Sequence, residues 1–293
     1  MSMVVLTLIV LAAGAGGWLW WSRRSAAAKP ALHVPNWVKD TVYLVQVLPS
    51  PQVRTISPFA LKLETWLRMV GLKYENVYTL KTGSKGQTPF IELNGTEIPD
   101  SNLIMKHLTR EFDLQPEGAY SPRDLAMAHS TRIMVENHLA FIGFYWRYGR
   151  PERYQFIMNN LVDVSELHPL LLRLAGVLFP RLIRFRMYMT GIARHSYEEI
   201  DQFSFDDLRA LSVQLGENPF YLGAEPSSID CTLFGHLAQF LYIPMDFPQK
   251  AFIHRECPNL VAYVERIKAK FWPDWEAMCS MECTRGKKGL PMF

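Results

Sequence analysis

The pattern of apolar and polar positions changes from mixed to almost wholly helical between residues 115 and 122 of this 293-residue chain. Before this change, short β-branched and apolar runs predict four strands, at 42–48, 73–80, 89–93 and 96–98. Asn94-Gly95, between the last two runs, predicts a tight hairpin. After the change, the periodicity predicts helices near 122–149, 152–165, 169–193, 197–216, 227–242 and 258–271. The expected fold class is therefore an α/β N-terminal domain followed by an all-α C-terminal domain.

A predicted helix follows the first predicted strand and begins beside a hydroxyl group. Ser57 occupies its N-cap position, Pro58 its first helical position, and Gly71 closes it. Unpaired N–H groups and the positive end of the helix dipole face the region beside Ser57. The dipole would stabilise a thiolate there by roughly 0.3–1 kcal/mol, and a hydroxyl hydrogen bond would add about 1.5–3 kcal/mol. Ser57 is therefore a candidate for activating a bound thiol, with an ordinary helix cap as the alternative.

Two further pairs of residues stand at positions that suit a peptide ligand. Pro89 begins a strand although it cannot donate to the sheet, and a cis bond there would present the backbone of Thr88 to a ligand. Asp100 and Ser101 open the next helix, whose N-terminus suits a carboxylate. The alternatives are a trans proline at a sheet edge and ordinary helix capping. Together with Ser57, these residues resemble the layout by which a thioredoxin-like domain holds glutathione, so glutathione is the expected co-substrate.

The N-terminus has a composition unlike the rest of the chain. Residues 3–21 contain no charged residue and are long enough to span a hydrocarbon core. Tryptophans end this run, and Arg23 and Arg24 follow it, so the positive-inside rule places the remaining chain in the cytosol. A cleaved signal peptide is the competing interpretation, but it would need a cationic segment before the apolar run. We expect a single-pass transmembrane helix within residues 1–24, followed by a linker at 25–40.

Composition and charge exclude several classes of function. With 49% hydrophobic and 20% charged residues, the chain is expected to be globular, with domains at 41–114 and 122–276 and a tail at 277–293. Its net charge of +3 is too small to indicate nucleic-acid binding. The sequence also lacks an RNP, zinc-finger or helix-turn-helix signature. A nucleic-acid partner is therefore not expected.

The four cysteines form no Cys-x-x-Cys pair, and a cytosolic setting would keep them reduced. Cys231 falls in an apolar helix and is expected to be inert core. Cys279 and Cys283, near the tail, are expected to be a solvated thiol pair. Together with His254 and Cys257 they give only thin support for metal handling, because soft metals need clustered thiolates. A metal site is therefore not expected.

The C-terminal half contains residues that could be taken for functional ones. Ser227 and Asp230 form a capping box before an apolar run, so Asp230 is expected to serve folding rather than catalysis. The aromatic run 145–148 could line an apolar substrate pocket, but its spacing favours a place in the core. Neither feature therefore adds a catalytic residue.

The segment 170–192 is apolar but carries four arginines and an internal proline, so it is a poor membrane span. As a basic amphipathic helix, it could lie on an anionic membrane surface. The other interpretation, which the sequence favours, is a helix of the C-terminal domain with snorkelling arginines.

Several runs of the sequence resemble the failed-axon-connections family. The similarity extends over residues 40–276, and its motifs lie at 57–69, 86–94, 230–239 and 265–273. The family includes cadmium-responsive proteins of nematodes and is related to metaxins and glutathione transferases. The resemblance implies a thioredoxin-like N-terminal domain, a helical C-terminal domain and often an N-terminal membrane segment. It also implies a role in axon development or in toxic-metal handling, and members are not generally established as enzymes.

The resemblance and the motifs leave two main hypotheses. In the first, the chain is a membrane-anchored glutathione transferase-like protein in which glutathione, activated near Ser57, attacks a small electrophile held against the helical domain. In the second, it is a non-catalytic, membrane-tethered adaptor with a role in axon development, because fold does not fix function. A homodimer or a protein partner is compatible with both.

Overall fold

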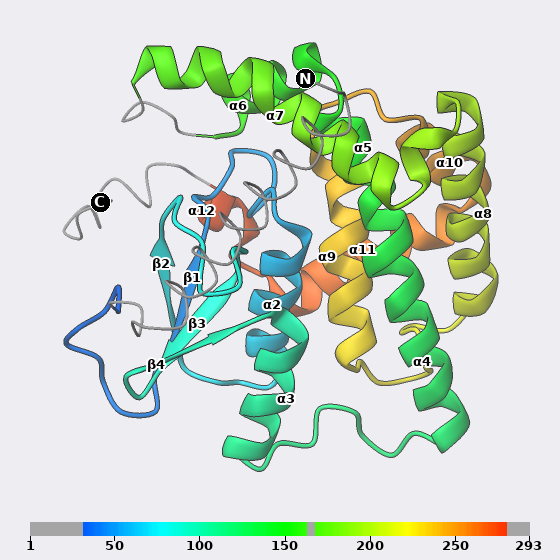
Figure 1. The fold of residues 1–293 in the computed structure, drawn as a ribbon. Helices are drawn as coiled ribbons and strands as arrows, with labels where there is room; N and C mark the ends of the chain where they lie inside the picture. The colour runs from blue at the N-terminus through cyan, green and yellow to red at the C-terminus, as the bar shows by residue number, and fades with distance from the viewer. Residues whose placement is uncertain (1–31, 163–167, 280–293) are drawn as a thin grey trace, which may run out of the picture.

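The computed structural model describes residues 32–162 and 168–279, with a small sheet on one side and a group of helices on the other (Figure 1). The sheet contains β1 (Val42–Gln46), β2 (Tyr74–Tyr78), β3 (Phe90–Leu93) and β4 (Thr96–Pro99). All four expected strands are therefore present. Helices α2 (Pro58–Met69) and α3 (Ser101–Glu111) lie between the sheet and the C-terminal helices. The N-terminal part is the thioredoxin-like α/β unit that the sequence predicts.

The strand order is β2-β1-β3-β4, with β1 parallel to β2 and antiparallel to β3. β1 is buried along its whole length because both of its faces are covered. Val42 and Leu44 pack with residues of α2 and α3, whereas Tyr43 and Val45 pack on the opposite face. The β3–β4 hairpin turns through Asn94 and Gly95, both with positive φ, as expected for an Asn-Gly turn.

After Ser121, the regular elements among the described residues are helices, apart from an isolated β-bridge between Phe220 and Gly223. Its first helices are α4 (Pro122–Met134), a π-helical turn (Val135–Leu139), α5 (Ala140–Tyr148), α6 (Pro151–Asn160) and α7 (Pro169–Met189). A short 3-10 turn (Ile192–Arg194) leads to α8 (Tyr197–Leu215), α9 (Ser228–Tyr242), α10 (Pro248–Glu256), α11 (Pro258–Phe271) and α12 (Trp275–Cys279). Helices α10 and α12 were not expected, because each is short and begins without a strong apolar period. The domain limits at 41–114 and 122–276 remain predictions.

Helix α9 holds the two parts together. It is buried on nearly every side, from Ile229 to Leu241, and packs directly on α2. A Cβ at Gly235 would lie 2.5 Å from the carbonyl oxygen of Pro58 and 2.8 Å from the backbone nitrogen of Lys62. Only glycine therefore permits this approach, which sets the start of α2 directly against the C-terminal helices.

Asp230, at the start of α9, is a structural residue as expected. Its carboxylate accepts hydrogen bonds from Ser227 N at 2.8 Å, Tyr221 N at 2.8 Å and Tyr263 Oη at 2.7 Å. Burial raises the pKa of this carboxyl group, although the hydrogen bonds act in the opposite direction. The capping box thus joins three C-terminal segments rather than forming part of a catalytic site.

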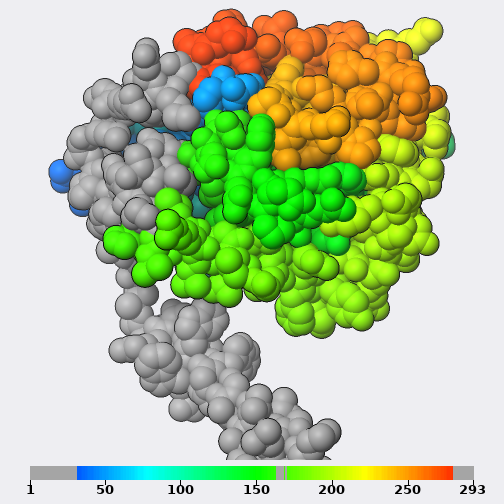
Figure 2. All heavy atoms as spheres, turned by 90° about the horizontal axis from the view of Figure 1, so that it is seen from above, coloured from blue at the N-terminus to red at the C-terminus, as the bar shows by residue number. Residues whose placement is uncertain are grey.

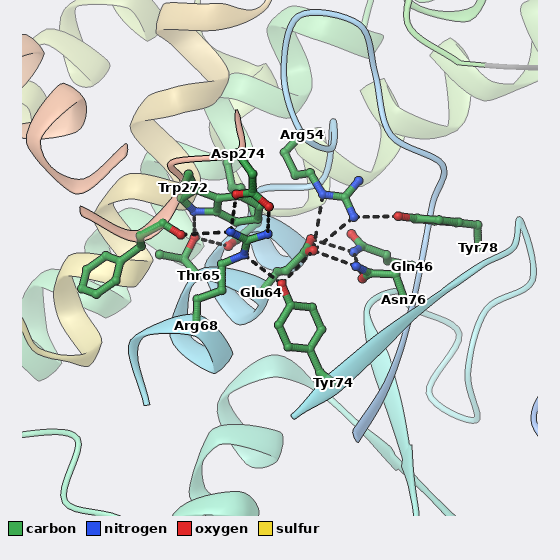
Figure 3. A network of polar contacts seen from close by, with 12 residues as sticks. Gln46, Arg54, Glu64, Thr65, Arg68, Tyr74, Asn76, Tyr78, Trp272 and Asp274 are labelled. Atoms are coloured by element: carbon green, nitrogen blue, oxygen red, sulfur yellow. Dashed lines mark hydrogen bonds and ion pairs between the residues drawn. The ribbon is translucent and has the colours of Figure 1, made fainter. Parts of the chain in front are cut away.

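A buried polar network connects the sheet with α2 (Figure 3). Glu64 Oε1 accepts hydrogen bonds from Arg54 Nη2 at 3.1 Å and Asn76 Nδ2 at 2.8 Å, and its Oε2 accepts one from Gln46 Nε2 at 2.9 Å. Arg54 and Glu64 are both completely buried. The network fixes the loop between β1 and α2, which leads to the candidate residue Ser57.

The same helix is tied to the end of the C-terminal part. Arg68 donates to both carboxylate oxygens of Asp274, at 2.6 and 2.9 Å, and its guanidinium carbon lies 3.8 Å from the ring centroid of Trp272 (Figure 3). Trp272 Nε1 donates to Thr65 Oγ1 at 3.0 Å. These contacts span more than 200 residues of sequence and join α2 to the segment after α11.

Two expectations about the ends of the chain have different outcomes. Within 32–162 and 168–279, no helix combines the length and apolar character needed to cross a bilayer. The expected anchor at 3–21 lies outside these residues and remains a prediction. The expectation of a solvated thiol pair is wrong for Cys279, which is 2% exposed, and Cys283 lies outside the described residues. Burial raises the pKa of the Cys279 thiol to about 12, so it is not a reactive thiolate.

Candidate functional site

The strand register places the segments that carry the predicted site residues at one end of the sheet, where β1 and β4 end and β3 begins. Phe90, the first residue of β3, is paired with Val45 near the end of β1 and with Pro99 at the end of β4. Consequently, three segments share this end of the sheet: the loop leading to Ser57, the Thr88–Pro89 bond and the start of α3. The three segments that the sequence singled out therefore begin or end at the same end of the sheet.

Ser57 caps α2 as expected. Its backbone is extended, with φ −94° and ψ 113°, and its Oγ accepts a hydrogen bond from Ala60 N at 3.3 Å. The side chain is only partly buried, so the hydroxyl proton is available to a ligand. Arg147 Nη1 donates to the carbonyl oxygen of Ile56 at 2.9 Å. The C-terminal domain thus holds the residue that directly precedes the cap.

The Thr88–Pro89 peptide bond is cis, as expected. Pro89 is buried and Thr88 is partly exposed. Within residues 32–162 and 168–279, no backbone hydrogen bond occupies the N–H or the C=O group of Thr88. Both groups can therefore pair with an extended peptide ligand.

Asp100 and Ser101 have different roles at the start of α3. Asp100 Oδ1 accepts from the backbone N–H groups of Asn102 and Leu103, both at 3.0 Å, so its carboxylate is the N-cap of the helix. The capping alternative is therefore correct for Asp100. Ser101 is 6% exposed, and its Oγ accepts a long hydrogen bond, 3.4 Å, from Lys62 Nζ.

Lys62 is a part of this site that the sequence did not identify. Its ammonium group is completely buried and lies 2.6 Å from both Glu136 Oε1 and Asn102 Oδ1. Glu136 Oε2 also accepts from Asn102 Nδ2 at 2.8 Å and from Arg132 Nη1 at 3.1 Å. The cluster joins α2, α3 and the π-helical turn across the domain boundary. No local pattern indicates this cluster, because Lys62 and Glu136 are 74 residues apart.

The electrostatics of this cluster are set by burial and by the ion pair. Burial lowers the pKa of Lys62, and the attraction of Glu136 only partly opposes this effect. Burial acts to raise the pKa of Glu136, but Lys62 and the hydrogen bonds outweigh it and leave that pKa below its ordinary value. The Lys62 nitrogen lies beside Ser101 at the start of α3, and when protonated it would attract a carboxylate ligand, with part of its charge offset by Glu136.

A small cavity of about 10 Å³ lies behind Pro58. Arg147, His236 and Gln239 line it, with Gly143, Phe240 and Phe247. Its volume is near the minimum for one water molecule. Within the described part of the chain, His236 Nε2 has no hydrogen-bond partner, and burial lowers the pKa of its imidazole to about 4. A neutral histidine at this position suits a buried water better than a general base.

The side chains at 145–148 belong to the core, as the sequence favoured. Tyr145, Trp146, Arg147 and Tyr148 are each at most 8% exposed. Arg147 additionally donates to Gln239 Oε1 at 3.1 Å. These residues therefore fix the approach of the C-terminal helices to Ser57.

A larger groove of about 860 Å³ runs along α3. It lies between α3, the linker at 114–117, α4 and the start of α9, and Asn102, Arg110 and Arg132 are among its lining residues. Ser57, Thr88 and Ser101 line neither this groove nor the small cavity. Within the described ranges, no three His, Cys, Asp or Glu side chains are grouped so that they could hold a metal ion.

Comparison with protein families identifies both parts of the chain. The family model described as "Glutathione S-transferase N-terminal domain" matches residues 58–153, and "Glutathione S-transferase, C-terminal domain" matches 205–267. A solved glutathione S-transferase from Methylobacterium radiotolerans, in complex with glutathione sulfonate, has a TM-score of 0.52 and 15% identity. That match covers 78% of this chain and 91% of the other. At this identity, the likeness establishes the fold alone.

Three curated proteins are similar in sequence. Failed axon connections from Drosophila melanogaster is 37% identical over 274 residues, which are 88% of this chain and 65% of the fly protein. Isoprene-epoxide–glutathione S-transferase from Rhodococcus sp. is 28% identical over 231 residues, 76% of this chain and 96% of that enzyme. A metaxin-1 homologue from Caenorhabditis briggsae is 37% identical over 75 residues, 26% of this chain and 24% of the metaxin.

The fly relative matches nearly the whole of this chain, whereas the chain spans 65% of the length of that relative. The metaxin match and the two domain models agree with the thioredoxin-like sheet and the helical C-terminal part. The chain therefore carries both domains of the glutathione S-transferase-like proteins and is similar over 88% of its length to failed axon connections of the fly.

Proposed function

We propose that this chain binds glutathione and presents its thiolate to a small electrophile. The observation that carries the proposal is the arrangement at one end of the sheet of three groups: the Ser57 hydroxyl, the start of α3, and the backbone of Thr88, which pairs with no backbone group of the described residues. A relative that covers most of this chain is named as a transferase of glutathione to an isoprene epoxide. The residues at this end of the sheet fit the glutathione peptide, because they offer a hydroxyl group for its thiolate, backbone groups for its peptide bond and a hydrogen-bond donor for its carboxylate.

The proposed roles follow from the position of each group. The Ser57 hydroxyl donates a hydrogen bond to the thiolate at the positive end of α2 and so lowers the pKa of the bound thiol. The Thr88 N–H and C=O pair with the peptide backbone of the ligand. Ser101, with the Lys62 ammonium 3.4 Å from its Oγ, holds the γ-glutamyl carboxylate. The glutathione thiol loses its proton to water, its sulfur forms a C–S bond as a C–O bond of a small epoxide breaks, and the resulting alkoxide takes a proton from water.

Calorimetric titration of the full chain in detergent with glutathione tests this proposal. Binding in the micromolar to low-millimolar range supports it. The absence of heat over that range contradicts it. Conjugation of glutathione to a small epoxide, followed in the same preparation, then separates a catalytic protein from one that only binds.

The second candidate function is a non-catalytic adaptor, and one observation favours it. Ser101 and Lys62 already take part in a network with Glu136 that joins the two domains. In this role the network only stabilises the domain arrangement, and the surface of the protein binds a partner. The name of the fly relative refers to axon connections, and the metaxin similarity is compatible with a protein partner or a homodimer.

The proposed setting for either function is a membrane. Residues 3–21 form the single-pass anchor and the body faces the cytosol, from the length of the apolar run and the arginines that follow it. Protease treatment of sealed vesicles tests the topology. Digestion of the body from the cytosolic side supports it, and protection of residues beyond Arg24 contradicts it.

A further inference from the structure

Helix α7 carries an apolar stripe on its outward side. More exposed large hydrophobic side chains lie on α7 than on all other described elements together. Six of them, each more than half exposed, recur every three or four residues: Leu170, Leu174, Leu178, Leu182, Phe185 and Met189. This spacing places them on one face of the helix. Figure 2 looks onto the side of the molecule on which α6 and α7 lie, and Figure 1 shows α7 along that side.

The opposite face of α7 packs against the rest of the protein. Met187 is 2% exposed, and the ring of Phe179 lies 5.8 Å from that of Tyr148 and 5.2 Å from that of Tyr154. The helix is therefore packed through its inner face against α5 and α6. The exposed stripe is additional apolar surface, which in a soluble protein usually marks a binding site.

The charges on α7 are all positive. Arg173, Arg181, Arg184 and Arg186 are exposed, and the helix contains no Asp or Glu. At about 100° per residue, Arg173 and Arg184 lie on one border of the apolar stripe, Arg186 lies on the other, and Arg181 lies within it. In the part of the chain that the structure describes, no carboxylate forms an ion pair with any of them.

We propose that α7 lies flat on an anionic phospholipid bilayer. In this position the apolar stripe enters the boundary between headgroups and acyl chains, and the arginines on its two borders reach the lipid phosphates. Each arginine near an anionic leaflet strengthens the attraction. A protein partner would have to neutralise four arginines, two of which lie on one border and one on the other. The stripe contains none of the residues proposed to bind glutathione, so this proposal does not depend on glutathione binding.

The test measures lipid contact at α7 itself. The full chain is mixed with vesicles of phosphatidylcholine, with or without phosphatidylserine, that contain a photoactivatable diazirine phospholipid. After illumination, mass spectrometry locates the labelled peptides. We expect labelling within 169–189 on the vesicles that contain phosphatidylserine, and at least about tenfold less on phosphatidylcholine alone. Because the readout is local, it is independent of any anchoring by residues 3–21.

Matched variants separate charge from apolar contact. Arg181→Gln with Arg184→Gln should lower labelling of α7 by about tenfold, because two charges near the leaflet are removed. Leu178→Ser with Leu182→Ser should lower it on both kinds of vesicle. Arg110→Gln, an exposed arginine of α3, is the control and should leave labelling unchanged. All these side chains are exposed, so the variants are expected to fold.

Three results would overturn the proposal. Equal labelling of α7 with and without phosphatidylserine would show that charge has no part in the contact. Unchanged labelling in the arginine and leucine variants would show that the stripe is not the contact. Protein–protein crosslinks through 169–189 in place of lipid adducts would assign the stripe to a second copy or a protein partner.

Discussion

Lys62 Nζ on α2 and Glu136 Oε1 on the π-helical turn lie 2.6 Å apart, and both side chains are almost completely buried. The pair joins the N-terminal and C-terminal parts directly beside Ser101. A buried ion pair of this kind need not add net stability, because burying both charges is costly. Its role is to fix the relative position of α2, α3 and the π-helical turn, on which the candidate site depends.

Removal of one partner from this pair should strongly destabilise the protein. Lys62→Met leaves Glu136 buried without its main counter-charge, so the free energy of unfolding should fall by about 3–5 kcal/mol. The double variant Lys62→Met with Glu136→Leu should lose less than the single one. Urea denaturation of the unaltered protein, Lys62→Met, Glu136→Leu alone and the double variant measures both effects. A double variant as unstable as the sum of two single losses would refute the coupling.

Ser57→Ala should lower the rate of glutathione conjugation by about 10²-fold or more while changing binding little, because the hydroxyl acts mainly on the thiolate. Loss of the cap should also cost about 1 kcal/mol of stability. Ser196→Ala, which removes an equivalent cap from α8, is the control and should cost similar stability without changing the rate. Steady-state kinetics and denaturation are measured together. An equal loss of rate in both variants would exclude a specific role for Ser57.

Ser101→Ala should weaken glutathione binding by around 1–2 kcal/mol, the typical value of a lost hydrogen bond to a charged group. Calorimetric titration measures this directly. Ser130→Ala, at an exposed position of α4, is the control. If Ser57→Ala and Ser101→Ala both lower stability and neither changes glutathione affinity, the two residues are only structural and the adaptor function is favoured.

Gly235→Ala should destabilise the protein and disturb the start of α2. The new methyl group would lie 2.5 Å from the Pro58 carbonyl oxygen, so α9 and α2 must separate, at a cost of about 1–3 kcal/mol or more. Gly176→Ala on α7 is the control, because nothing lies within 4 Å of its added Cβ. That change should be neutral or stabilising by up to about 1 kcal/mol. Thermal unfolding of both variants tests the difference in sign.

The stability of the protein should depend on the protonation of His138. A hydrogen bond from its ring to Asp207, 2.7 Å long, raises the pKa of the imidazole above its ordinary value of 6.5. A raised folded-state pKa gives a contribution that is fully present below the unfolded pKa and is lost as the pH rises through the folded one. His138→Asn should therefore destabilise the protein more at about pH 5 than at about pH 9.

Denaturation at several pH values measures this difference. A larger loss in His138→Asn at the higher pH would contradict the assignment, because the sign would then be reversed.

Several local features of the fold were predictable from the sequence. The strands, the Asn94-Gly95 hairpin and the Ser57 cap were predicted correctly, since each depends on the conformational preferences of a few adjacent residues. The candidate site was predicted in part. The segments that carry Ser57, Thr88 and Ser101 lie at the same end of the sheet, whereas the Asp100 carboxylate caps its own helix, and the role of the first three in binding stays a prediction.

Other features depend on segments that are far apart in the sequence. Lys62 meets Glu136 across the domain boundary, and Cys279 is buried although its local sequence indicates a solvated thiol. The apolar face of α7 could equally have been covered, and only its packing through Phe179 shows which side is exposed.

By itself, the sequence determined the four strands, most of the helices, their order and their main caps, because backbone preferences and hydrogen bonds to nearby residues are local. Only the tertiary structure decided which polar groups are buried together and which apolar groups are left in solvent. Those outcomes depend on how α2, α3 and α9 pack across the domain boundary. The close approach at Gly235 controls that packing, and no local pattern reveals which surface will lie opposite a given helix face.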